Sequence, residues 1–317
     1  MHIPKKFLFL VKMAMSVGFI SWLFFRVEWS EVAQYILDVQ GVPLFFYGVL
    51  LLLGMLISAR KWQIIAREKE FFGPFHDFFR AYLTGTFINN FLPSTIGGDT
   101  YRTLWLGRRD GKLSPALSTT VFDRFTGLWA LMVFTLLFSL VHISLVLDHL
   151  DWLLLVVIIV CSLLLDLVFP WLQRILWLRR FFQWVPERIH RLFAEIQTLA
   201  RGKILFRSLG YALMFNFIGV GLANLVLFYA LGGDMRPLDY LGVIFIASII
   251  SSIPISINNI GLKEWAYVTF FAYLGVGAEI AIAVAITSRF IQMIVSFFAI
   301  PFYLRSRDLL GREVVGK

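Results

Sequence analysis

Long runs of apolar residues divide this sequence, and they constrain its fold more than any other feature. A helix rises about 1.5 Å per residue and the hydrocarbon core of a bilayer is about 30 Å thick, so a membrane span needs about twenty mostly apolar residues. Charged residues make up 15% of the 317 residues, whereas about a quarter of a soluble chain is charged. The sequence therefore predicts an all-α, polytopic integral membrane protein with a single transmembrane domain over residues 1–317. Six runs predict full spans: Phe7–Phe25, Val42–Ala59, Leu117–Leu147, Trp152–Leu172, Tyr211–Leu231 and Ile280–Leu304.

Lysine and arginine are concentrated in some of the segments between these runs. Such residues accumulate in the short cytoplasmic loops of membrane proteins. We therefore expect the basic segments and both termini in the cytoplasm, and a multi-pass protein of the cell inner (plasma) membrane. The basic segments are Arg60–Arg67, Arg102–Lys112, Arg174–Arg207 and Arg305–Lys317, and the segments predicted outside are Arg26–Asp38, His142–Asp151 and Gly232–Asp239.

The longest basic segment, residues 174–207, interleaves arginine with aromatic and aliphatic residues. That pattern is typical of a helix that lies in the lipid headgroup region and is attracted to an anionic membrane surface, although ordinary loop topology explains the charges equally well. The net charge of +9 does not indicate nucleic-acid binding, because the basic residues punctuate apolar runs. The single Cys161 excludes an intramolecular disulfide framework, and the five scattered histidines favour neither a metal ion nor another cofactor.

Two shorter apolar runs, Ala81–Leu92 and Tyr240–Ile253, are too short to cross the membrane and return. Each is followed by a stretch rich in Asn, Gly, Pro and Ser. The sequence therefore predicts two re-entrant helical hairpins, about residues 76–109 and 240–275, which enter from opposite sides. Non-helical backbone at membrane depth is tolerated only where protein or a water-filled cavity satisfies it, and interrupted segments of this kind mark binding sites in transporters. We expect the two breaks to line a cavity.

The first break combines two glycines with an aspartate and an arginine. Gly97 and Gly98 allow unusual backbone dihedrals, and a helix that starts beside Asp99 would direct its free amide groups toward the break as an anion site. Asp99 could instead cap that helix. Arg102 shares a helix face with Asp99, where it could bind a phosphate through two hydrogen bonds or snorkel to water.

Charges inside membrane segments are costly and are therefore functional candidates. Asp123 and Arg124 lie within one predicted span, and Arg289 lies within another. We expect Glu264 to pair with Arg289 or with Lys263. The alternative is an ion-pair network that only fixes helix packing. The candidate substrate-binding residues, none of them catalytic, are Asn90, Pro93, Ser94, Gly97, Gly98, Asp99, Arg102, Asp123, Arg124, Pro254, Ser256, Asn258, Asn259, Gly261, Lys263, Glu264 and Arg289.

Three motifs and one arginine carry a family resemblance: Asn89–Arg102 (NNFLPSTIGGDTYR), the Asp-Arg-x-x-Gly of Asp123–Gly127, Pro254–Glu264, and Arg289 in the last span. They resemble the flippase-like membrane family, whose best-known member is the transmembrane domain of bacterial lysylphosphatidylglycerol synthase. The resemblance implies a helical inner-membrane domain that moves a phospholipid from the cytoplasmic to the outer leaflet. This chain has Asn258-Asn259 where family members usually carry Gly-Gly; asparagine adopts left-handed dihedrals readily. We expect no aminoacyl-transferase activity, because the soluble domain that carries it in the synthase does not follow the last span.

We therefore expect a membrane lipid translocase for a phospholipid or a polyprenyl-phosphate-type lipid, and not an enzyme. One alternative is a membrane-embedded lipid-modifying enzyme, such as a polyprenyl-sugar-dependent glycosyltransferase. Another is a non-catalytic protein that binds anionic lipid and a partner membrane protein; a homo-oligomer is compatible with each alternative. The sequence contains no GxxxxGK[ST] nucleotide-binding loop, so a gradient, the substrate itself or a partner would drive transport.

Overall fold

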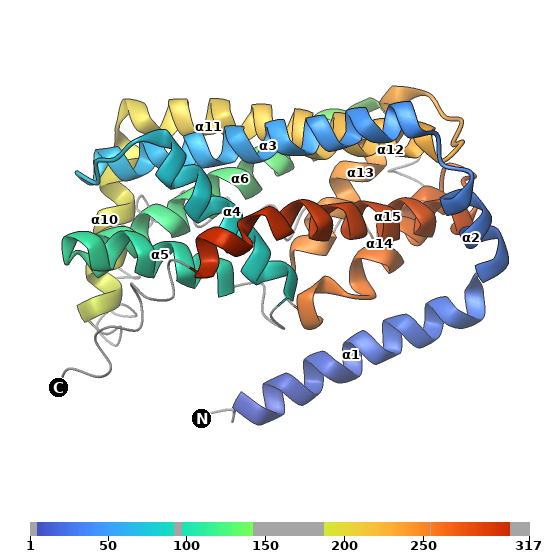
Figure 1. Cartoon of the computed structure of the whole chain (residues 1–317), viewed down its shortest axis with the longest axis horizontal. Coiled ribbons are helices and arrows are strands. Elements are labelled where there is room, and N and C mark those ends of the chain that lie inside the picture. Colours follow the sequence, from blue (N-terminus) through green and yellow to red (C-terminus); the bar gives the residue numbers. More distant parts are fainter. Residues whose placement is uncertain (1–4, 92–96, 142–186, 254, 305–317) are drawn as a thin grey trace.

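The computed structural model describes residues 5–91, 97–141, 187–253 and 255–304, and all regular elements in these ranges are helices (Figure 1). Four helical stretches are long and apolar enough to cross a membrane, and a bent helix pair is a fifth candidate. This confirms the predicted all-α, polytopic membrane class. The predicted span Trp152–Leu172 lies outside the described residues. The four stretches are α3 (Gly41–Glu68), residues Leu113–Phe138 of α6 (Leu113–Val141), Lys203–Ala230, and Ala278–Leu304.

The stretch Lys203–Ala230 changes its winding in the middle. A π-helical segment, η1 (Asn216–Leu222), joins α11 (Lys203–Phe215) to α12 (Ala223–Ala230). A Cβ atom added to Gly54 would lie 3.0 Å from the Cα atom of Gly219, so α3 and η1 cross with their backbones in close contact. Wide turns of this kind inside a helix are frequent at functional sites. The stretch Ala278–Leu304 comprises α15 (Ala278–Ser296) and a short 3₁₀ turn, η3 (Phe297–Ala299).

The bent pair consists of α1 (Lys5–Arg26) and α2 (Trp29–Leu37), which meet at an angle of 89°. The segment Arg26–Asp38, predicted as an external loop, therefore contains a helix, because Val32 and its apolar neighbours follow helical spacing and pack into the core. Figure 1 shows that α1 lies apart from most of the bundle.

One face of α1 looks toward the rest of the protein. Ser16 and Leu23 are buried on this face, whereas Phe24 and Phe25 are exposed. Lys12 is half-buried and lies one helical turn before Ser16, so it shares the face that turns toward the protein.

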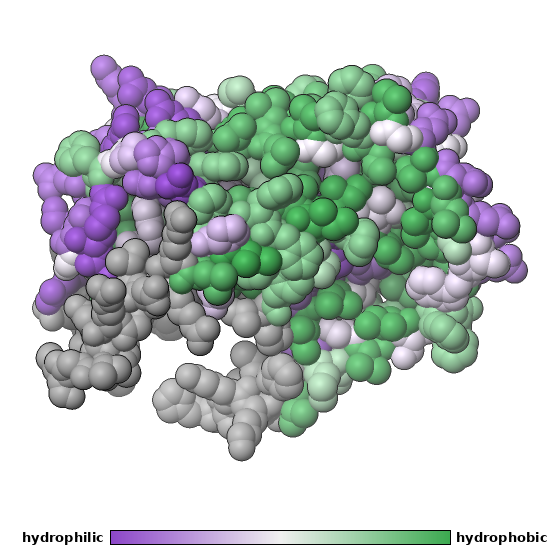
Figure 2. Space-filling view, in the orientation of Figure 1, coloured by the Kyte–Doolittle hydropathy of each residue, from purple (hydrophilic) through white to green (hydrophobic). Residues whose placement is uncertain are grey.

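The surface supports a position within a membrane. Figure 2 shows an apolar belt around the middle of the visible face and hydrophilic residues at both ends. Contiguous exposed apolar surface is uncommon on soluble monomers and marks contact with lipid or with other proteins. Large exposed side chains of this kind include Phe24, Phe25, Phe45, Phe46, Phe206, Phe290 and Phe298.

Segments predicted on the two sides of the membrane lie at opposite ends of the molecule. At one end, Lys112 Nζ lies 3.0 Å from Glu70 Oε2, and Lys69 Nζ donates a hydrogen bond to Thr198 Oγ1 at 2.8 Å. At the other end, the amide of Gln40 donates to the carbonyl of Ala230 at 2.9 Å. The described parts of the predicted basic and acidic loops are therefore separated as one membrane orientation requires, and which end faces the cytoplasm stays a prediction. The predicted loops His142–Asp151 and Arg305–Lys317 lie outside the described residues.

The basic segment predicted over residues 174–207 is described from residue 187 onward. Its described part forms α10 (Glu187–Arg201), which packs against α6 and α11. Gly202 has extended backbone dihedrals and separates the two helices. Residues 203–207 therefore belong to the first turns of α11, a membrane-crossing candidate, rather than to an interfacial segment.

Two helical hairpins start from opposite ends of the molecule and meet near its centre (Figure 1). In each hairpin, two packed helices flank one of the predicted breaks. The Nδ2 atom of Asn258 donates a hydrogen bond to the main-chain oxygen of Asn90 at 3.3 Å. The two breaks therefore touch at this bond. The first hairpin contains α4 (Phe75–Phe91) and α5 (Gly97–Asp110), and the second contains α13 (Pro237–Ser252), the short turn η2 (Ile257–Asn259) and α14 (Leu262–Ala272).

The largest apolar core anchors the second hairpin. The rings of Phe228, Tyr240 and Phe271 pack together, with centroids 4.9 Å and 5.1 Å from that of Tyr240. Tyr240 also donates a hydrogen bond from its hydroxyl to the carbonyl of Asn224 at 2.9 Å. This packing fixes α13 and α14 against α12 at the end of the molecule where the hairpin starts.

Candidate functional site

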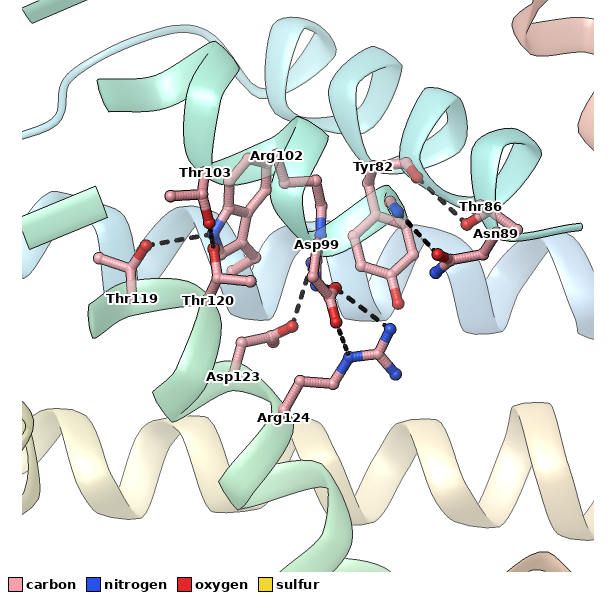
Figure 3. A network of polar contacts seen from close by, with 12 residues as sticks. Tyr82, Thr86, Asn89, Asp99, Arg102, Thr103, Thr119, Thr120, Asp123 and Arg124 are labelled. Atoms are coloured by element: carbon pink, nitrogen blue, oxygen red, sulfur yellow. Dashed lines mark hydrogen bonds and ion pairs between the residues drawn. The ribbon is translucent and has the colours of Figure 1, made fainter. Parts of the chain in front are cut away.

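Five charged side chains from α3, α5 and α6 form one network, called here the charged cluster: Lys61, Asp99, Arg102, Asp123 and Arg124. Arg102 Nη2 donates to Asp99 Oδ1 at 2.6 Å, and its Nη1 donates to Asp123 Oδ2 at 3.1 Å (Figure 3). Arg124 Nε donates to Asp99 Oδ2 at 2.7 Å. Lys61 Nζ lies 3.1 Å from Asp123 Oδ1 and donates to the main-chain oxygen of Asp123 at 2.8 Å.

The order of the chain explains this meeting. Asp99 and Arg102 are three residues apart and share one face of α5. A two-residue turn after Asp110 sends α6 back along α5, and Thr103 on α5 bonds to Thr120 on α6 at 3.1 Å. The next turn of α6 therefore places its charged residues beside those of α5.

Arg102 lies at the centre of the charged cluster. Its side chain is 4% exposed. The guanidinium carbon lies 5.1 Å from the ring centroid of Trp62 and 4.9 Å from that of Tyr82. Bonds to two carboxylates and contact with two aromatic faces satisfy an arginine charge without water. Arg102 therefore connects α5 to α6 from a buried position.

Arg124 differs from Arg102 in its exposure, because 54% of its side chain is accessible. Its Nε and Nη2 atoms are directed at Asp99, and Figure 3 shows the remaining guanidinium nitrogen pointing away from this carboxylate. Among the described residues, Nη1 has no hydrogen-bond partner. Arg124 is therefore the arginine of the charged cluster that keeps donors free for a ligand.

The start of α5 depends on a close approach to α4. A Cβ atom on Gly98 would lie 2.0 Å from the carbonyl oxygen of Gly85, so only glycine fits here. The amide of Gly98 donates to Asn89 Oδ1 at 2.7 Å. Because α5 begins at Gly97, Asp99 lies inside its first turn rather than at the N-cap. The sequence predicts that the amides at the start of α5 are free to bind an anion. The amide of Gly98 is instead bonded to the side chain of Asn89.

A cavity of about 410 Å³ lies beside the charged cluster. Residues of α3, α4, α5, α6, α11, η1 and α13 contribute to its wall. The cavity is therefore bordered by helices of both hairpins and by membrane-crossing candidates. Asp99 brings the first break into the wall, whereas no described residue of the second break lines it, contrary to the expectation that both breaks would. Its polar lining residues are Ser58, Lys61, Tyr82, Asp99, Asp123, Arg124, Asn216, Ser248 and Ser252.

A second cluster forms at the break of the second hairpin. Arg289 Nε and Nη2 donate to Glu264 Oε1 at 3.2 Å and 3.1 Å, so the predicted pairing of these two residues is confirmed. Arg289 Nη1 donates to the carbonyl of Asn258 at 3.1 Å and Nη2 to that of Asn259 at 3.2 Å. Arg289 therefore ties α15 to the non-helical backbone of the break.

The backbone of the second break has the expected dihedrals. Asn258 and Asn259 have φ values of 50° and 56°, and Gly261 has a φ of 81°. The amide of Gly261 donates to Glu264 Oε2 at 2.8 Å, and that of Ile257 donates to Ser16 Oγ on α1 at 2.9 Å. Side chains from α1 and α14 thus satisfy backbone groups that a helix would otherwise pair.

Lys263 carries the other cation of the second cluster. Its Nζ atom donates to Ser288 Oγ at 2.6 Å and lies 5.4 Å from the ring centroid of Tyr267. No carboxylate in the described part of the chain is within ion-pair distance of Lys263, so Glu264 pairs with Arg289 instead. A cation among apolar helices without a carboxylate partner is costly and points to function.

Several predicted site residues lie apart from these two clusters or outside the described residues. Asn90 donates from Nδ2 to the carbonyl of Gln292 at 3.3 Å and so connects α4 to α15. Ser256 is buried, and its hydroxyl has no partner among the residues the structure describes. Pro93, Ser94 and Pro254 fall outside the described residues.

The sequence interpretation missed Lys61, Tyr82, Asn89 and Asn216 as site residues. Lys61 belongs to the predicted basic segment Arg60–Arg67, but helical spacing places it on the face of Ser58 and Ile65. Asn216 is a polar residue inside a predicted span, and its Nδ2 donates to the carbonyls of Gly127 and Ala212 at 3.1 Å and 2.9 Å. Intramembrane polarity was the signal that could have identified it.

Apolar membrane-crossing candidates around a cavity with charged residues in its wall define a multi-pass integral membrane protein. The chain belongs to the family described as the lysylphosphatidylglycerol synthase transmembrane region, whose model matches residues 9–299. It is also similar to a UPF0104 membrane protein from Methanothermobacter thermautotrophicus (strain Delta H), with 24% identity over 274 residues, which cover 77% of this chain and 80% of that protein. No solved structure matches the chain.

Proposed function

We propose that this protein moves a phospholipid, or another phosphate-bearing lipid, between the leaflets of the inner membrane. The observation that carries the proposal is the cavity of about 410 Å³ beside Lys61 and Arg124, within a molecule whose visible face carries an apolar belt between hydrophilic ends. A charged headgroup needs such a polar cavity to cross the hydrocarbon layer. Its acyl chains stay in the surrounding lipid, which matches the belt.

The two hairpins suggest how the cavity is presented to each side in turn. They start from opposite ends of the molecule, and their breaks touch through a long hydrogen bond from Asn258 to Asn90. A rocking movement of one hairpin against the other would expose the cavity alternately, as in transporters built around broken helices. The π-helical segment η1 borders the cavity, so the winding of the stretch Lys203–Ala230 is irregular at that point.

Two other functions remain as competing outcomes of the test. A lipid-modifying enzyme would release a modified lipid or sugar product. A non-catalytic partner protein would be expected to join its hairpins by dry, apolar contacts, whereas here the breaks meet through asparagines and a cavity with charged residues in its wall adjoins helices of both hairpins. The polar character of this region favours transport over the non-catalytic alternative.

The test is a translocation assay in liposomes with phospholipids that carry a fluorophore on an acyl chain. Dithionite bleaches the fluorophore in the outer leaflet only, so the protected fraction reports exchange between leaflets. We expect Arg124→Ala and Arg289→Ala to slow translocation at least about tenfold, which corresponds to about 1.4 kcal/mol. Arg67→Ala is the matched control, because Arg67 is exposed near the end of α3 and does not line the cavity. The proposal is overturned if translocation is no faster than in protein-free liposomes. It is also overturned if neither arginine substitution slows translocation.

A further inference from the structure

The charges beside the cavity are unequal. The charged cluster contains three cationic side chains, Lys61, Arg102 and Arg124, and two carboxylates, Asp99 and Asp123. With all five ionised, it has one positive charge in excess. Arginine stays protonated in proteins, and Lys61 is held by the Asp123 carboxylate at 3.1 Å.

Every carboxylate oxygen of the charged cluster is already paired with a cation. Asp99 Oδ1 accepts from Arg102 and Arg124, and Asp99 Oδ2 accepts from Arg124. Asp123 Oδ2 accepts from Arg102, and Asp123 Oδ1 lies beside the ammonium of Lys61. Among the described residues, a ligand ammonium that entered the cavity would therefore have to compete with these cations for the carboxylates.

The free hydrogen-bonding capacity of the charged cluster is that of a donor. Arg124 is half-exposed, and its Nη1 atom has no partner among the described residues. A guanidinium with free N–H groups is suited to a phosphate oxygen. The accessible part of the cluster thus matches an anion and opposes a cation.

The second cluster likewise contains more basic groups than carboxylates. Lys263 and Arg289 face one carboxylate, Glu264, whose Oε1 accepts from Arg289 and whose Oε2 accepts from the amide of Gly261. Lys263 Nζ bonds to the neutral hydroxyl of Ser288. In both clusters, therefore, each carboxylate is already held by a cation of the protein.

We propose that the cavity selects lipids whose headgroups carry a net negative charge, such as phosphatidylglycerol, over zwitterionic and cationic lipids. This inference rests on the proposed translocase function and names its substrate class. A phosphate without a covalently attached ammonium receives hydrogen bonds from Arg124 and neutralises the excess charge. An ethanolamine or aminoacyl headgroup brings its ammonium next to Lys61 and Arg124, where like charges repel.

The test compares three acyl-labelled lipids in the same liposomes: phosphatidylglycerol, phosphatidylethanolamine and the cationic lysyl ester of phosphatidylglycerol. We expect the wild-type protein to translocate phosphatidylglycerol about tenfold faster than phosphatidylethanolamine, a preference of about 1.4 kcal/mol, and the lysyl ester most slowly. Arg124→Gln should bring the first two rates close together. Arg124→Lys, which keeps the charge, should retain the preference, and so should the control Arg67→Gln.

A binding measurement separates failure of selectivity from failure of transport. Native mass spectrometry of the purified protein should show more retained phosphatidylglycerol than phosphatidylethanolamine or lysyl ester. Equal rates for all three lipids with equal binding would leave translocation standing and overturn the selectivity. Absence of translocation would overturn the proposed function, while the binding preference would still decide whether the cavity is an anion site. Preferential binding or transport of the lysyl ester would overturn the inference. If Arg124→Gln does not elute as a folded species on size exclusion, the wild-type lipid series decides alone.

Discussion

The Nδ2 atom of Asn258 donates a hydrogen bond to the main-chain oxygen of Asn90, 3.3 Å away, and joins the breaks of the two hairpins. Asn258 has a φ of 50°, and its own carbonyl accepts from Arg289 Nη1 at 3.1 Å. The first hairpin is therefore linked to α15 both through Asn258 and through Asn90, which bonds to Gln292. This arrangement makes α15 the element against which both breaks are positioned.

The left-handed backbone of Asn258 predicts a difference between two substitutions. Asn258→Ala and Asn258→Gly both remove the bond to Asn90, but only alanine brings a Cβ atom into the left-handed region, which costs about 1–2 kcal/mol. We expect the alanine variant to melt at a lower temperature in detergent than the glycine variant. Indistinguishable melting temperatures would show that this backbone conformation is not held in the folded protein.

Arg102 and Arg124 should affect stability differently. Removing one partner of a buried ion pair costs about 3–5 kcal/mol, and Arg102 bridges two carboxylates from a side chain that is 4% exposed. We expect Arg102→Leu to lower the melting temperature strongly and Arg102→Lys to rescue it only in part, because lysine lacks the planar fork. Arg124→Gln should cost less stability than Arg102→Leu, because Arg124 is half-exposed. The opposite order in thermal melts would contradict the assignment of Arg102 as the buried bridge.

The crossing of α4 and α5 should tolerate no side chain at Gly98. A Cβ atom there would lie 2.0 Å from the carbonyl oxygen of Gly85, which is backbone and cannot rotate away. We expect Gly98→Ala to reduce the yield of folded protein on size exclusion. Gly210→Ala is the matched control: Gly210 lies in α11 with open space around it, so alanine should be neutral or stabilise by up to about 1 kcal/mol. Equal behaviour of the two variants would refute the close approach.

Lys263 should matter more for activity than for stability. Its ammonium bonds to Ser288 and contacts Tyr267, with no carboxylate partner among the described residues. Replacing an unpaired buried cation with an apolar side chain of similar length removes a desolvation cost. We expect Lys263→Met to melt at the wild-type temperature or above it and to translocate phospholipid more slowly. Lower stability together with unchanged translocation would assign Lys263 a structural role.

The sequence predicted those parts of the site that depend on local spacing or on an isolated intramembrane charge. The placement of Arg102 on the helix face of Asp99 follows from three-residue spacing, and the pairing of Glu264 with Arg289 follows from two charges with few alternatives in apolar surroundings. The burial of Arg102 in ion pairs with Asp99 and Asp123, instead of on a phosphate or at the water surface, does not follow from spacing. The left-handed dihedrals of Asn258 follow from its residue type.

The remaining contacts depend on how helices distant in the sequence pack together. Lys61 and Asp123 are far apart in the chain, and a basic residue near the end of a span is ordinarily assigned to the cytoplasm. Only the crossing of α3 with α6 shows that Lys61 turns inward. The 89° bend between α1 and α2 and the capping of Gly98 by Asn89 likewise require tertiary contacts that hydropathy and spacing do not contain.

An electron cryo-microscopy structure of the protein in nanodiscs that contain phosphatidylglycerol would show whether the cavity holds a lipid headgroup. We predict headgroup density in the cavity, within hydrogen-bond distance of Arg124 and next to Lys61 and Asn216, with acyl chains that leave toward the apolar belt. The Arg124→Gln variant in the same nanodiscs should lose that density. Ordered lipid confined to the outer surface of the belt, with side chains filling the cavity between α3, α6 and η1, would contradict the proposal that this cavity carries a lipid headgroup.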